Sequence, residues 1–177
     1  GNGKMAYQFL GGILHNAQAS CSFFNPTVNS YKRINAPVTS SGATWAPTTV
    51  TYGGNNRTHM VRIPDEGRFE LRLMDGAANP YLMQAAAIAG GLDGLANKRD
   101  PGKRLDIDMY ADGHKIKGAK KLPLNMLDAL RLTEGSKELR AAMGDELIDS
   151  YVKLKNHEWD RYCHHLSGWE RENTLDC

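Results

Sequence analysis

Residues 57–81 read RTHMVRIPDEGRFELRLMDGAANPY, and the organisation of the chain follows from this stretch outward. Residues 68–73 alternate between charged and apolar side chains, the period-two pattern of a strand with one charged and one apolar face. Residues 59–63 form a second, shorter run of this kind. Between the runs, Pro64–Gly67 has the composition of a turn, because proline can begin a tight turn and glycine can end it. The stretch therefore predicts a β-hairpin near residues 59–73.

The predicted hairpin has two different faces. Phe69, Leu71 and Leu73 share the apolar face, and Met60 is expected on the same side as Arg62, opposite to it. The charged residues come from both strands and from one position just upstream: Arg57, Arg62, Arg68, Glu70 and Arg72. They form either a solvated surface with ion pairs between the strands, or a site in which the carboxylate binds a metal ion and the guanidiniums bind phosphate or carboxylate oxygens. The alternation alone leaves both interpretations open.

The composition is that of an ordinary globular domain. The chain has 177 residues, 41% hydrophobic and 24% charged, which is enough for one domain with a sizeable core. A net charge of +2 is too small to indicate a nucleic-acid partner, and no apolar run approaches the ~20 residues that cross a bilayer. The widely spaced cysteines (Cys21, Cys163 and Cys177) indicate a reducing compartment without a disulfide framework. We therefore expect a cytoplasmic protein that binds neither nucleic acid nor membrane.

Helices are expected on both sides of the hairpin. Residues 4–20 place apolar side chains at helical spacing, and Gly11–Gly12 would let a neighbouring helix approach closely. A second helix is predicted from Pro80, with Asn79 as its N-cap and a small, apolar body that indicates burial. From Pro123 onward the pattern is helical.

The segment before the hairpin is rich in turn-forming residues. Residues 35–57 consist largely of Ser, Thr, Gly, Pro and Asn, and a loop of this length inside a domain is usually functional or mobile. We expect one short strand in it, near residues 48–52, and Trp45 as an anchor that buries its ring.

These elements together predict an α+β fold. An antiparallel sheet containing the hairpin should bury its apolar face against the first helix and the helix from Pro80, and the C-terminal third should be all helical. Residues 1–177 are expected to form a single domain, in which residues 1–122 carry the sheet and the site and residues 123–177 form a helical tail.

One cluster outside the hairpin has the residue types of a metal site. His157, either Asp160 or Arg161, and His164 fall on one face of the last long helix. A zinc-protease helix needs a second histidine four residues after the first, and Arg161 occupies that position. A helix surface of mixed polarity is therefore the better interpretation.

Motifs in a fixed order resemble the C-terminal half of the glutamine synthetase catalytic domain. They are NPTVNSYKR at 25–33, NRTHMVRIP at 56–64, RFELR at 68–72 and ANPYL at 78–82. The tail, with LPLNMLDAL, AMGDEL and WER, is similar to the helical end of the same family. Within the family, the chain most resembles the divergent bacterial branch that includes γ-glutamylmethylamide synthetase.

The resemblance implies an ATP-dependent ligase that acts on L-glutamate. Members of the family transfer the γ-phosphoryl group of ATP to the side-chain carboxylate of glutamate, and ammonia or a small alkylamine such as methylamine then displaces phosphate to form an amide. This chemistry needs Mg²⁺ or Mn²⁺ between the phosphates, and Glu70 resembles one of the metal ligands. For the full-length protein the resemblance implies a homo-oligomeric ring.

The same resemblance implies roles for the arginines. Binding of glutamate is implied for Arg33, Arg57 and Arg72, of which Arg33 resembles the residue that binds the α-carboxylate. Binding of ATP is implied for Arg57, Arg62 and Arg68. Arg57 matches an arginine near the transferring phosphoryl group and is the implied catalytic residue.

The sequence departs from the family pattern in two places. Typical members carry a glutamate in a short flap after the Lys-Arg step, whereas no Asp or Glu occurs between Asn25 and Pro64. This departure favours an alkylamine over ammonia as the acceptor. The family also often has a lysine five residues before the metal-binding glutamate, and Asp65 stands there.

The remaining metal ligands and much of the nucleotide pocket of the family come from segments that precede the matched half. We therefore expect this polypeptide to be part of a longer protein and to have no ligase activity by itself. The alternative from another functional class is a non-catalytic module that binds anions or nucleotides, or another protein, through the arginine-rich face.

Overall fold

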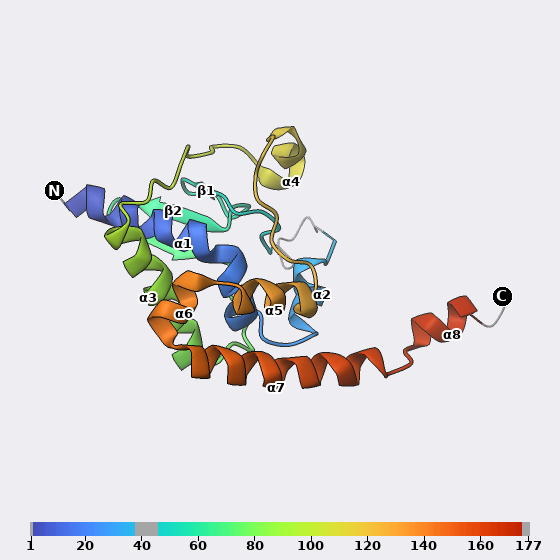
Figure 1. Cartoon of the computed structure of the whole chain (residues 1–177). Coiled ribbons are helices and arrows are strands. Elements are labelled where there is room, and N and C mark those ends of the chain that lie inside the picture. Colours follow the sequence, from blue (N-terminus) through green and yellow to red (C-terminus); the bar gives the residue numbers. More distant parts are fainter. Residues whose placement is uncertain (1, 38–45, 175–177) are drawn as a thin grey trace.

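The computed structural model describes residues 2–37 and 46–174, and it confirms the predicted α+β class (Figure 1). Trp45 lies outside the described residues. The elements are, in chain order, α1 (Asn2–Phe24), α2 (Ser30–Ile34), β1 (Tyr52–Gly53), β2 (Val61–Asp65), β3 (Arg68–Leu71), α3 (Pro80–Ala96), α4 (Met109–Asp112), the 3₁₀ turn η1 (Gly113–Lys115), α5 (Met126–Glu134), α6 (Lys137–Met143), α7 (Asp145–Cys163) and α8 (Gly168–Thr174).

Helix α1 is the centre of the fold. In Figure 1 it lies between the sheet above and helices α5 and α6 below, with α3 at its side. Glycines let α1 and α3 approach to backbone contact: a Cβ on Gly12 would lie 2.0 Å from the oxygen of Gly90, and one on Gly94 would lie 2.1 Å from the oxygen of Gln8. The close approach predicted from Gly11–Gly12 is therefore confirmed.

The sheet has the strand order β1-β2-β3. Strands β2 and β3 form the predicted antiparallel hairpin, with Arg62 opposite Glu70. The expectation of a purely antiparallel sheet was wrong, because β1 pairs with β2 in parallel. A turn in which Asn56 N donates to Gly54 O (2.7 Å) returns the chain to the start of β1 before β2 begins.

The hairpin turn is shorter than the sequence indicated. Strand β2 continues through Pro64 to Asp65, and the reversal takes place at Glu66–Gly67, with Gly67 at φ +79°. The pairing is irregular between Arg62 and Asp65. An irregular step of this kind tolerates a proline, which has no N–H to give to the partner strand.

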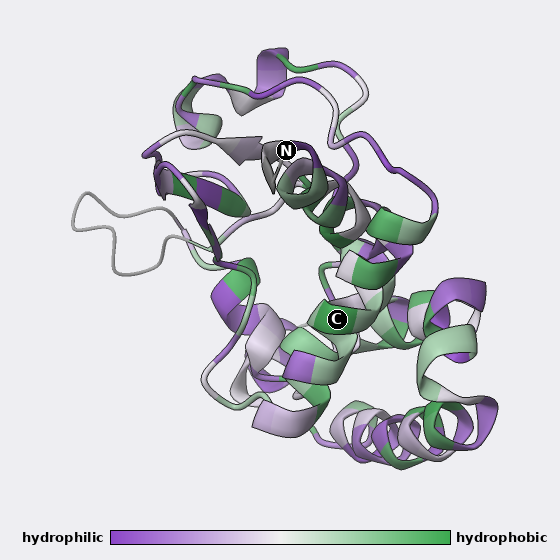
Figure 2. Cartoon of the chain, turned by 90° about the vertical axis from the view of Figure 1, so that its left-hand side faces the viewer, coloured by the Kyte–Doolittle hydropathy of each residue, from purple (hydrophilic) through white to green (hydrophobic). Residues whose placement is uncertain are grey.

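The apolar face of the hairpin packs on the core as expected. Leu73 is fully buried, and Phe69 lies against Phe9 of α1 with ring centroids 6.2 Å apart. Figure 2 shows the alternation of hydrophilic and hydrophobic residues along the strands. Met60 and Val61 are both completely buried, and Arg72 N donates to Met60 O at 2.8 Å, so contact between the two strands extends one residue before Val61.

Helix α3 begins as predicted, with the Asn79 side chain accepting hydrogen bonds from the N–H groups of Tyr81 and Leu82. Its predicted burial is only half correct. Small residues face α1, but Tyr81 is 84% exposed, Ile88 54% and Leu92 56%. The glycine-rich side of the helix is buried, Leu82 and Met83 are partly buried against the core, and the other large apolar side chains named here are exposed.

The C-terminal third is all helical among the described residues, as predicted. Helix α5 begins at Met126, after the N-cap Asn125 rather than at Pro123. Helix α7 packs back on α1, where Tyr151 stacks on Phe23 at 4.4 Å and donates to the oxygen of Ser22 at 2.7 Å.

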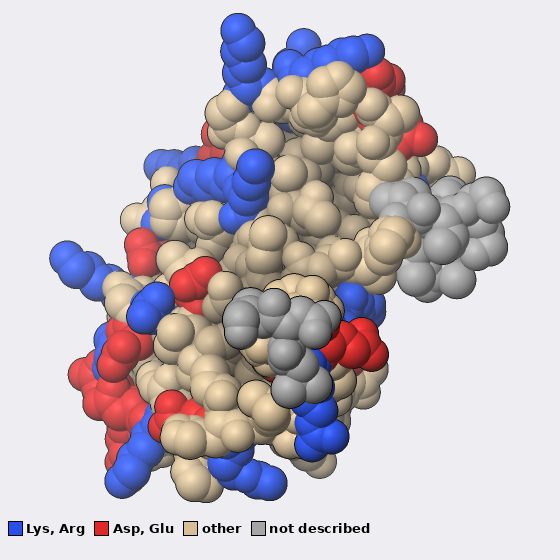
Figure 3. Space-filling view, turned by 90° about the vertical axis from the view of Figure 1, so that its right-hand side faces the viewer, with Lys and Arg blue, Asp and Glu red and all other residues tan. Residues whose placement is uncertain are grey.

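Helix α7 runs along one edge of the body and α8 lies beyond it (Figure 1). Lys and Arg side chains are interspersed with Asp and Glu over the face seen in Figure 3, in keeping with the small net charge. Within residues 2–37 and 46–174, no helix has the length and hydropathy to cross a bilayer.

Candidate functional site

Glu70 lies between two arginines on the charged face of the hairpin. Its Oε2 accepts a hydrogen bond from Arg62 Nη1 at 2.8 Å, and its Oε1 lies 3.3 Å from Arg72 Nε. The side chains of both arginines are only 16% exposed, whereas that of Glu70 is 45% exposed. The row Arg62–Glu70–Arg72 is therefore both the ion-paired sheet face of the first interpretation and the charged set required by the second.

Arg33 approaches the end of this row from α2. Its Nη2 donates to Leu73 O at 2.5 Å and to Asn25 Oδ1 at 3.0 Å. Burial lowers the pKa of Arg33, nearby Asp75 opposes this shift, and Arg72 adds to it. Because Leu73 directly follows Arg72, the hydrogen bond from Arg33 to Leu73 O places Arg33 at the Arg72 end of the row.

Each of these two arginines has a buried nitrogen with no hydrogen-bond partner among the described residues: Arg33 Nε and Arg72 Nη1. A buried donor without a partner is costly, and two neighbouring guanidiniums repel one another. A carboxylate accepts hydrogen bonds from guanidinium forks and carries the opposite charge, so it would relieve both costs.

Asn25, the first residue of the NPTVNSYKR motif, is completely buried. Its Nδ2 donates to Leu73 O at 3.1 Å, which leaves its Oδ1 to accept from Arg33. Asn25 thus fixes the orientation of Arg33 and ties it to the end of the hairpin. Its position at the start of the NPTVNSYKR motif was the signal that pointed to it.

Arg57 is exposed in the loop between β1 and β2. The loop is fastened to the segment before α4 by its neighbours. Asn56 Nδ2 donates to Ile107 O at 2.7 Å, Thr58 Oγ1 donates to Asn56 Oδ1 at 2.7 Å, and Met109 N donates to Thr58 Oγ1 at 2.9 Å. Arg57 therefore extends from an anchored backbone.

His59 adds a buried contact to the same anchor. Its Nε2 lies 3.0 Å from Ile107 O and its Nδ1 lies 3.0 Å from Thr51 Oγ1. Because a carbonyl only accepts, Nε2 carries the proton, and in the neutral ring Nδ1 accepts from the threonine hydroxyl. Burial lowers the pKa of His59, which favours this neutral form.

Arg57 and Arg62 line one pocket of about 520 Å³. The other residues that line it are Asn55, Asn56, Thr58 and Asp108. Asp108 is engaged as the N-cap of α4, where it accepts from the N–H groups of Tyr110 and Ala111. Two guanidiniums at one pocket provide the donors and the positive charge that phosphate groups require.

Arg68 lies apart from this pocket. It pairs with Asp65 at 3.1 Å beside the hairpin turn, and its side chain is 66% exposed. It lines a separate, more apolar groove between the start of α1 and the hairpin, together with Ile63 and Phe69. Its role in ATP binding stays a prediction.

Glu70 has the carboxylate oxygens that divalent cations prefer, and both of them contact arginines, so its role as a metal ligand stays a prediction. Within residues 2–37 and 46–174, no three His, Cys, Asp or Glu side chains are grouped closely enough to hold a metal ion. Mg²⁺ is commonly bound by one or two carboxylates together with water and substrate phosphates. A metal ion at Glu70 therefore requires further ligands beyond the described side chains.

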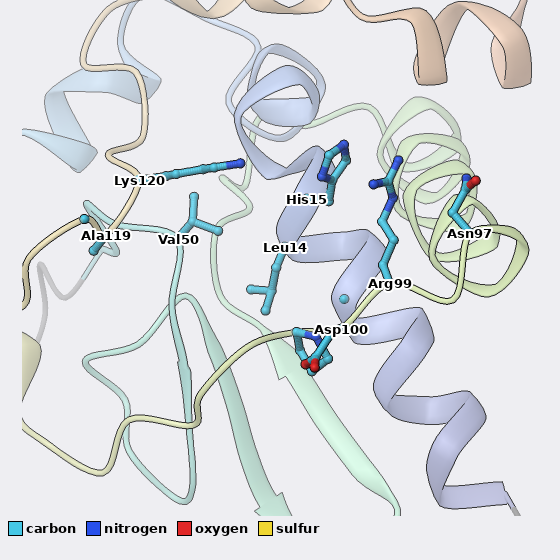
Figure 4. Close-up of a pocket in the computed structure, with 11 residues that line it drawn as sticks. Leu14, His15, Val50, Asn97, Arg99, Asp100, Ala119 and Lys120 are labelled. Atoms are coloured by element: carbon cyan, nitrogen blue, oxygen red, sulfur yellow. The ribbon is translucent and has the colours of Figure 1, made fainter.

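The pocket shown in Figure 4, of about 440 Å³, lies elsewhere, between α1 and the segments around Arg99 and Lys120. Two of its charged or titratable groups, His15 and Arg99, already have acidic partners. His15 and Arg99 approach Glu138 at 3.5 and 3.6 Å, and Arg99 Nε donates to Asp93 Oδ2 at 2.6 Å. These contacts join α1, α3 and α6, so we interpret the pocket as structural.

The histidines of α7 remain a surface feature. His157, Asp160, Arg161 and His164 line one shallow and exposed depression. His164 Nδ1 lies 2.6 Å from the backbone oxygen of Asp160. These contacts favour the mixed-polarity helix surface over a metal site. Cys21 and Cys163, the cysteines within the described residues, are both free.

The chain is similar to known proteins over nearly its full length. A family model described as the glutamine synthetase catalytic domain matches residues 1–174. A glutamine synthetase of Rhizobium leguminosarum is 61% identical over 168 residues, which are 95% of this chain and 39% of that protein. The glutamate–methylamine ligase of Methyloversatilis universalis is 42% identical over 176 residues, 98% of this chain and 39% of the relative.

Solved structures give the same result. A structure described as a GmaS/ADP complex superposes with a TM-score of 0.92 at 59% sequence identity, over 98% of this chain and 40% of that one. The chain spans about two fifths of the length of the curated relatives it matches. The fold, the order of the motifs and the match over residues 1–174 agree, and the chain therefore belongs to the glutamine synthetase catalytic-domain family.

Proposed function

We propose that this chain is the C-terminal part of one catalytic domain in an ATP-dependent ligase that joins L-glutamate to an amine. The observation that carries the proposal is the row Arg62–Glu70–Arg72, which continues towards Arg33 and its buried, unpartnered nitrogen. Such a row offers one oxygen ligand for a metal ion and several guanidiniums for phosphate and carboxylate groups. Membership of the family supports the type of reaction.

Glutamate binding falls to Arg33 and Arg72 in this proposal. The α-carboxylate of glutamate would accept hydrogen bonds from Arg33, whose Nε is buried without a partner among the described residues. Arg72 would contact the same substrate through Nη1, which is also buried without a hydrogen-bond partner among the described residues. Two fixed guanidiniums orient the substrate so that its side-chain carboxylate faces the phosphoryl donor.

In this proposal, ATP and its transferring phosphoryl group bind in the pocket lined by Arg57 and Arg62. Arg68 would make a further contact with ATP. Arg57 would stabilise the negative charge that develops as the γ-phosphoryl group moves to the glutamate carboxylate. Glu70 would provide one oxygen ligand for a Mg²⁺ or Mn²⁺ ion, which would neutralise negative charge on the phosphates. The amine then attacks the γ-glutamyl phosphate, and phosphate leaves.

We propose an alkylamine such as methylamine as the acceptor. The segment between Asn25 and Pro64 contains no carboxylate that would attract or deprotonate an ammonium ion. A relative named glutamate–methylamine ligase supports this assignment, while another relative is named glutamine synthetase. The deciding measurement is kcat/KM of the full-length protein for ammonia, methylamine and ethylamine. A higher value for ammonia than for methylamine would contradict the proposal.

The chain by itself should have no ligase activity, because Glu70 is one metal ligand where the chemistry needs several. A coupled ATP-hydrolysis assay of this chain with glutamate and methylamine tests this, and turnover would refute it. We expect the full-length enzyme to form a homo-oligomeric ring, which sedimentation velocity measures.

A simple anion-binding module is the second candidate, and the buried unpartnered nitrogens of Arg33 and Arg72 favour it equally. The two candidates differ at Glu70. In a ligase, Glu70→Gln weakens Mn²⁺ binding in the presence of nucleotide. In an anion binder, the same change removes a negative charge between two arginines and strengthens nucleotide binding.

A further inference from the structure

Asn55 contacts Arg62 from the loop between β1 and β2. Its Oδ1 accepts hydrogen bonds from Arg62 Nε at 2.9 Å and from Arg62 Nη2 at 2.6 Å. A single amide oxygen thus holds one whole edge of the guanidinium. The residue is exposed and belongs to a glycine- and asparagine-rich loop, so its sequence context gave no sign of this contact.

Together, Asn55 and Glu70 fix the orientation of the guanidinium. Arg62 Nη1 donates to Glu70 Oε2 at 2.8 Å, so each nitrogen of the group makes at least one hydrogen bond. A guanidinium carries five N–H donors, and these three contacts leave two for a ligand. Arg62 lines the pocket that also contains Arg57, which is where a ligand would meet those donors.

The backbone on both sides of Asn55 is anchored. Gly54 N donates to Asp106 Oδ1 at 3.3 Å, and Gly54 O accepts from Asn56 N at 2.7 Å and from Ile63 N at 3.1 Å. The Asn56 side chain holds Ile107 O. Asn55 therefore presents its amide from a backbone that is already fixed, which a positioning residue requires.

The neutrality of the Asn55 amide matters as much as its position. Glu70 is shared between Arg62 and Arg72, so one negative charge faces two positive ones. A carboxylate at position 55 would hold Arg62 equally well but would cancel the remaining charge. An amide oxygen orients the guanidinium and leaves its charge available to an anion.

We propose that Asn55 is a positioning residue that holds Arg62 in the orientation in which it binds the phosphate groups of a nucleoside triphosphate. The inference rests on the proposed function, since it assigns a ligand to the Arg57–Arg62 pocket. It adds a residue that acts through Arg62 rather than through direct contact with the substrate.

The test compares Asn55→Ala, Arg62→Ala and the double variant in the full-length protein, with calorimetric binding of MgATP and steady-state kinetics as readouts. We expect Asn55→Ala to raise both the Kd and the KM for MgATP about 10-fold, by analogy with the loss of residues that orient metal ligands. The KM for glutamate and the melting temperature should stay unchanged. Asn55→Ala should have no further effect in the Arg62→Ala background, because residues that act as a unit are not additive.

The control is Asn173→Ala, which removes another exposed asparagine side chain from α8 and should leave every value unchanged. An unchanged Kd in Asn55→Ala, an equal loss in the Arg62→Ala background, or a lowered melting temperature would each overturn the inference. A wild-type protein that binds MgATP but shows no turnover dependent on glutamate and amine would instead contradict the proposed function. The binding data then still decide the role of Asn55.

Discussion

Helices α1 and α3 meet where Gly12 faces Gly90 and Gly94, whereas strands β2 and β3 meet where Arg62 faces Glu70. The helix interface has backbone against backbone and no room for one additional carbon. The strand interface is half-buried and charged, and a nitrogen of Arg72 beside it lacks a partner among the described residues. The helix interface is closely packed backbone against backbone, whereas a buried nitrogen of Arg72 beside the strand interface has no hydrogen-bond partner among the described residues.

This difference separates stability from function. Close packing contributes dispersion energy and excludes water, so it stabilises the fold without offering anything to a ligand. Buried donors without partners cost stability unless a ligand binds them. Buried donors without partners on a charged face are therefore evidence of a binding site. Close backbone contacts at glycines, as between α1 and α3, are evidence of a rigid part of the fold.

The largest effect is expected at the charged site rather than at the helix interface. Arg57→Ala should lower kcat of the full-length enzyme about 10³-fold, as removal of an arginine that stabilises a transferring phosphoryl group does. The melting temperature should not change, because the Arg57 side chain is exposed. Stopped-flow or coupled kinetics measure the loss, and Arg171→Ala on α8 is the matched control. A loss below threefold would remove Arg57 from the catalytic assignment.

A change at the interface between α1 and α3 should instead lower stability. Gly12→Ala places a Cβ 2.0 Å from the oxygen of Gly90, so α1 and α3 must separate. We expect unfolding free energy to fall by about 3 kcal/mol, the upper range for overpacking. Chemical denaturation measures it. The control is Gly3→Ala on the same helix, where no atom lies within 4 Å of the added carbon, and it should leave stability unchanged or slightly raised.

Arg33 tests whether the buried guanidiniums bind glutamate. Arg33→Lys keeps the charge but cannot donate both to Leu73 O and Asn25 and to a carboxylate. We expect the KM for glutamate to rise about 10-fold, which corresponds to about 1.4 kcal/mol, with the KM for ATP unchanged. Lys32→Ala, at the exposed neighbouring position, is the control. Equal increases in both KM values would indicate a general structural defect.

The smallest effect is expected in the pH dependence of stability, through His59. Its pKa is lowered in the folded state by burial, while Ile107 O and the nearby carboxylates of Asp106 and Asp108 oppose the shift. Since the unfolded chain takes up the proton near pH 6.5, stability contributed by neutral His59 is fully present above that pH. It decreases as the pH falls below about 6.5 towards the folded pKa.

Denaturation of wild type and His59→Gln between pH 5 and pH 8 measures this contribution. The difference between the two proteins should be constant above about pH 6.5 and should narrow below it. Parallel curves over the whole range would show that His59 does not titrate differently in the two states.

The sequence predicted the hairpin, the cap of α3 and the helical tail because each depends on neighbouring residues. Alternation in Arg68–Leu73 needs only a strand with one buried face, and Asn79-Pro80 needs only a helix start. The errors occurred where distant segments decided the outcome. Strand β1 pairs with β2 in parallel because the loop after β1 turns the chain back.

The sequence indicated which charged residues belong to the candidate site, but not the hydrogen bonds that hold them. The motifs indicated Arg33, Arg57, Arg62, Arg68, Glu70 and Arg72, and their individual roles stay predictions. The contacts of Asn25 with Arg33 and of Asn55 with Arg62 were not predicted. Both asparagines resemble ordinary turn residues in the sequence, because the same residue type can either cap a turn or orient a guanidinium.

The sequence by itself determined the family, the alternating strands and the types of chemical group that the site contains, because side-chain period and motif order are properties of a linear chain. Only the tertiary structure decided which groups meet. It placed Gly12 against Gly94, separated Arg68 from the pocket of Arg57 and Arg62, and set Glu70 between two guanidiniums. Contacts between distant residues depend on how helices and strands pack, and packing is fixed by the whole core rather than by any one segment.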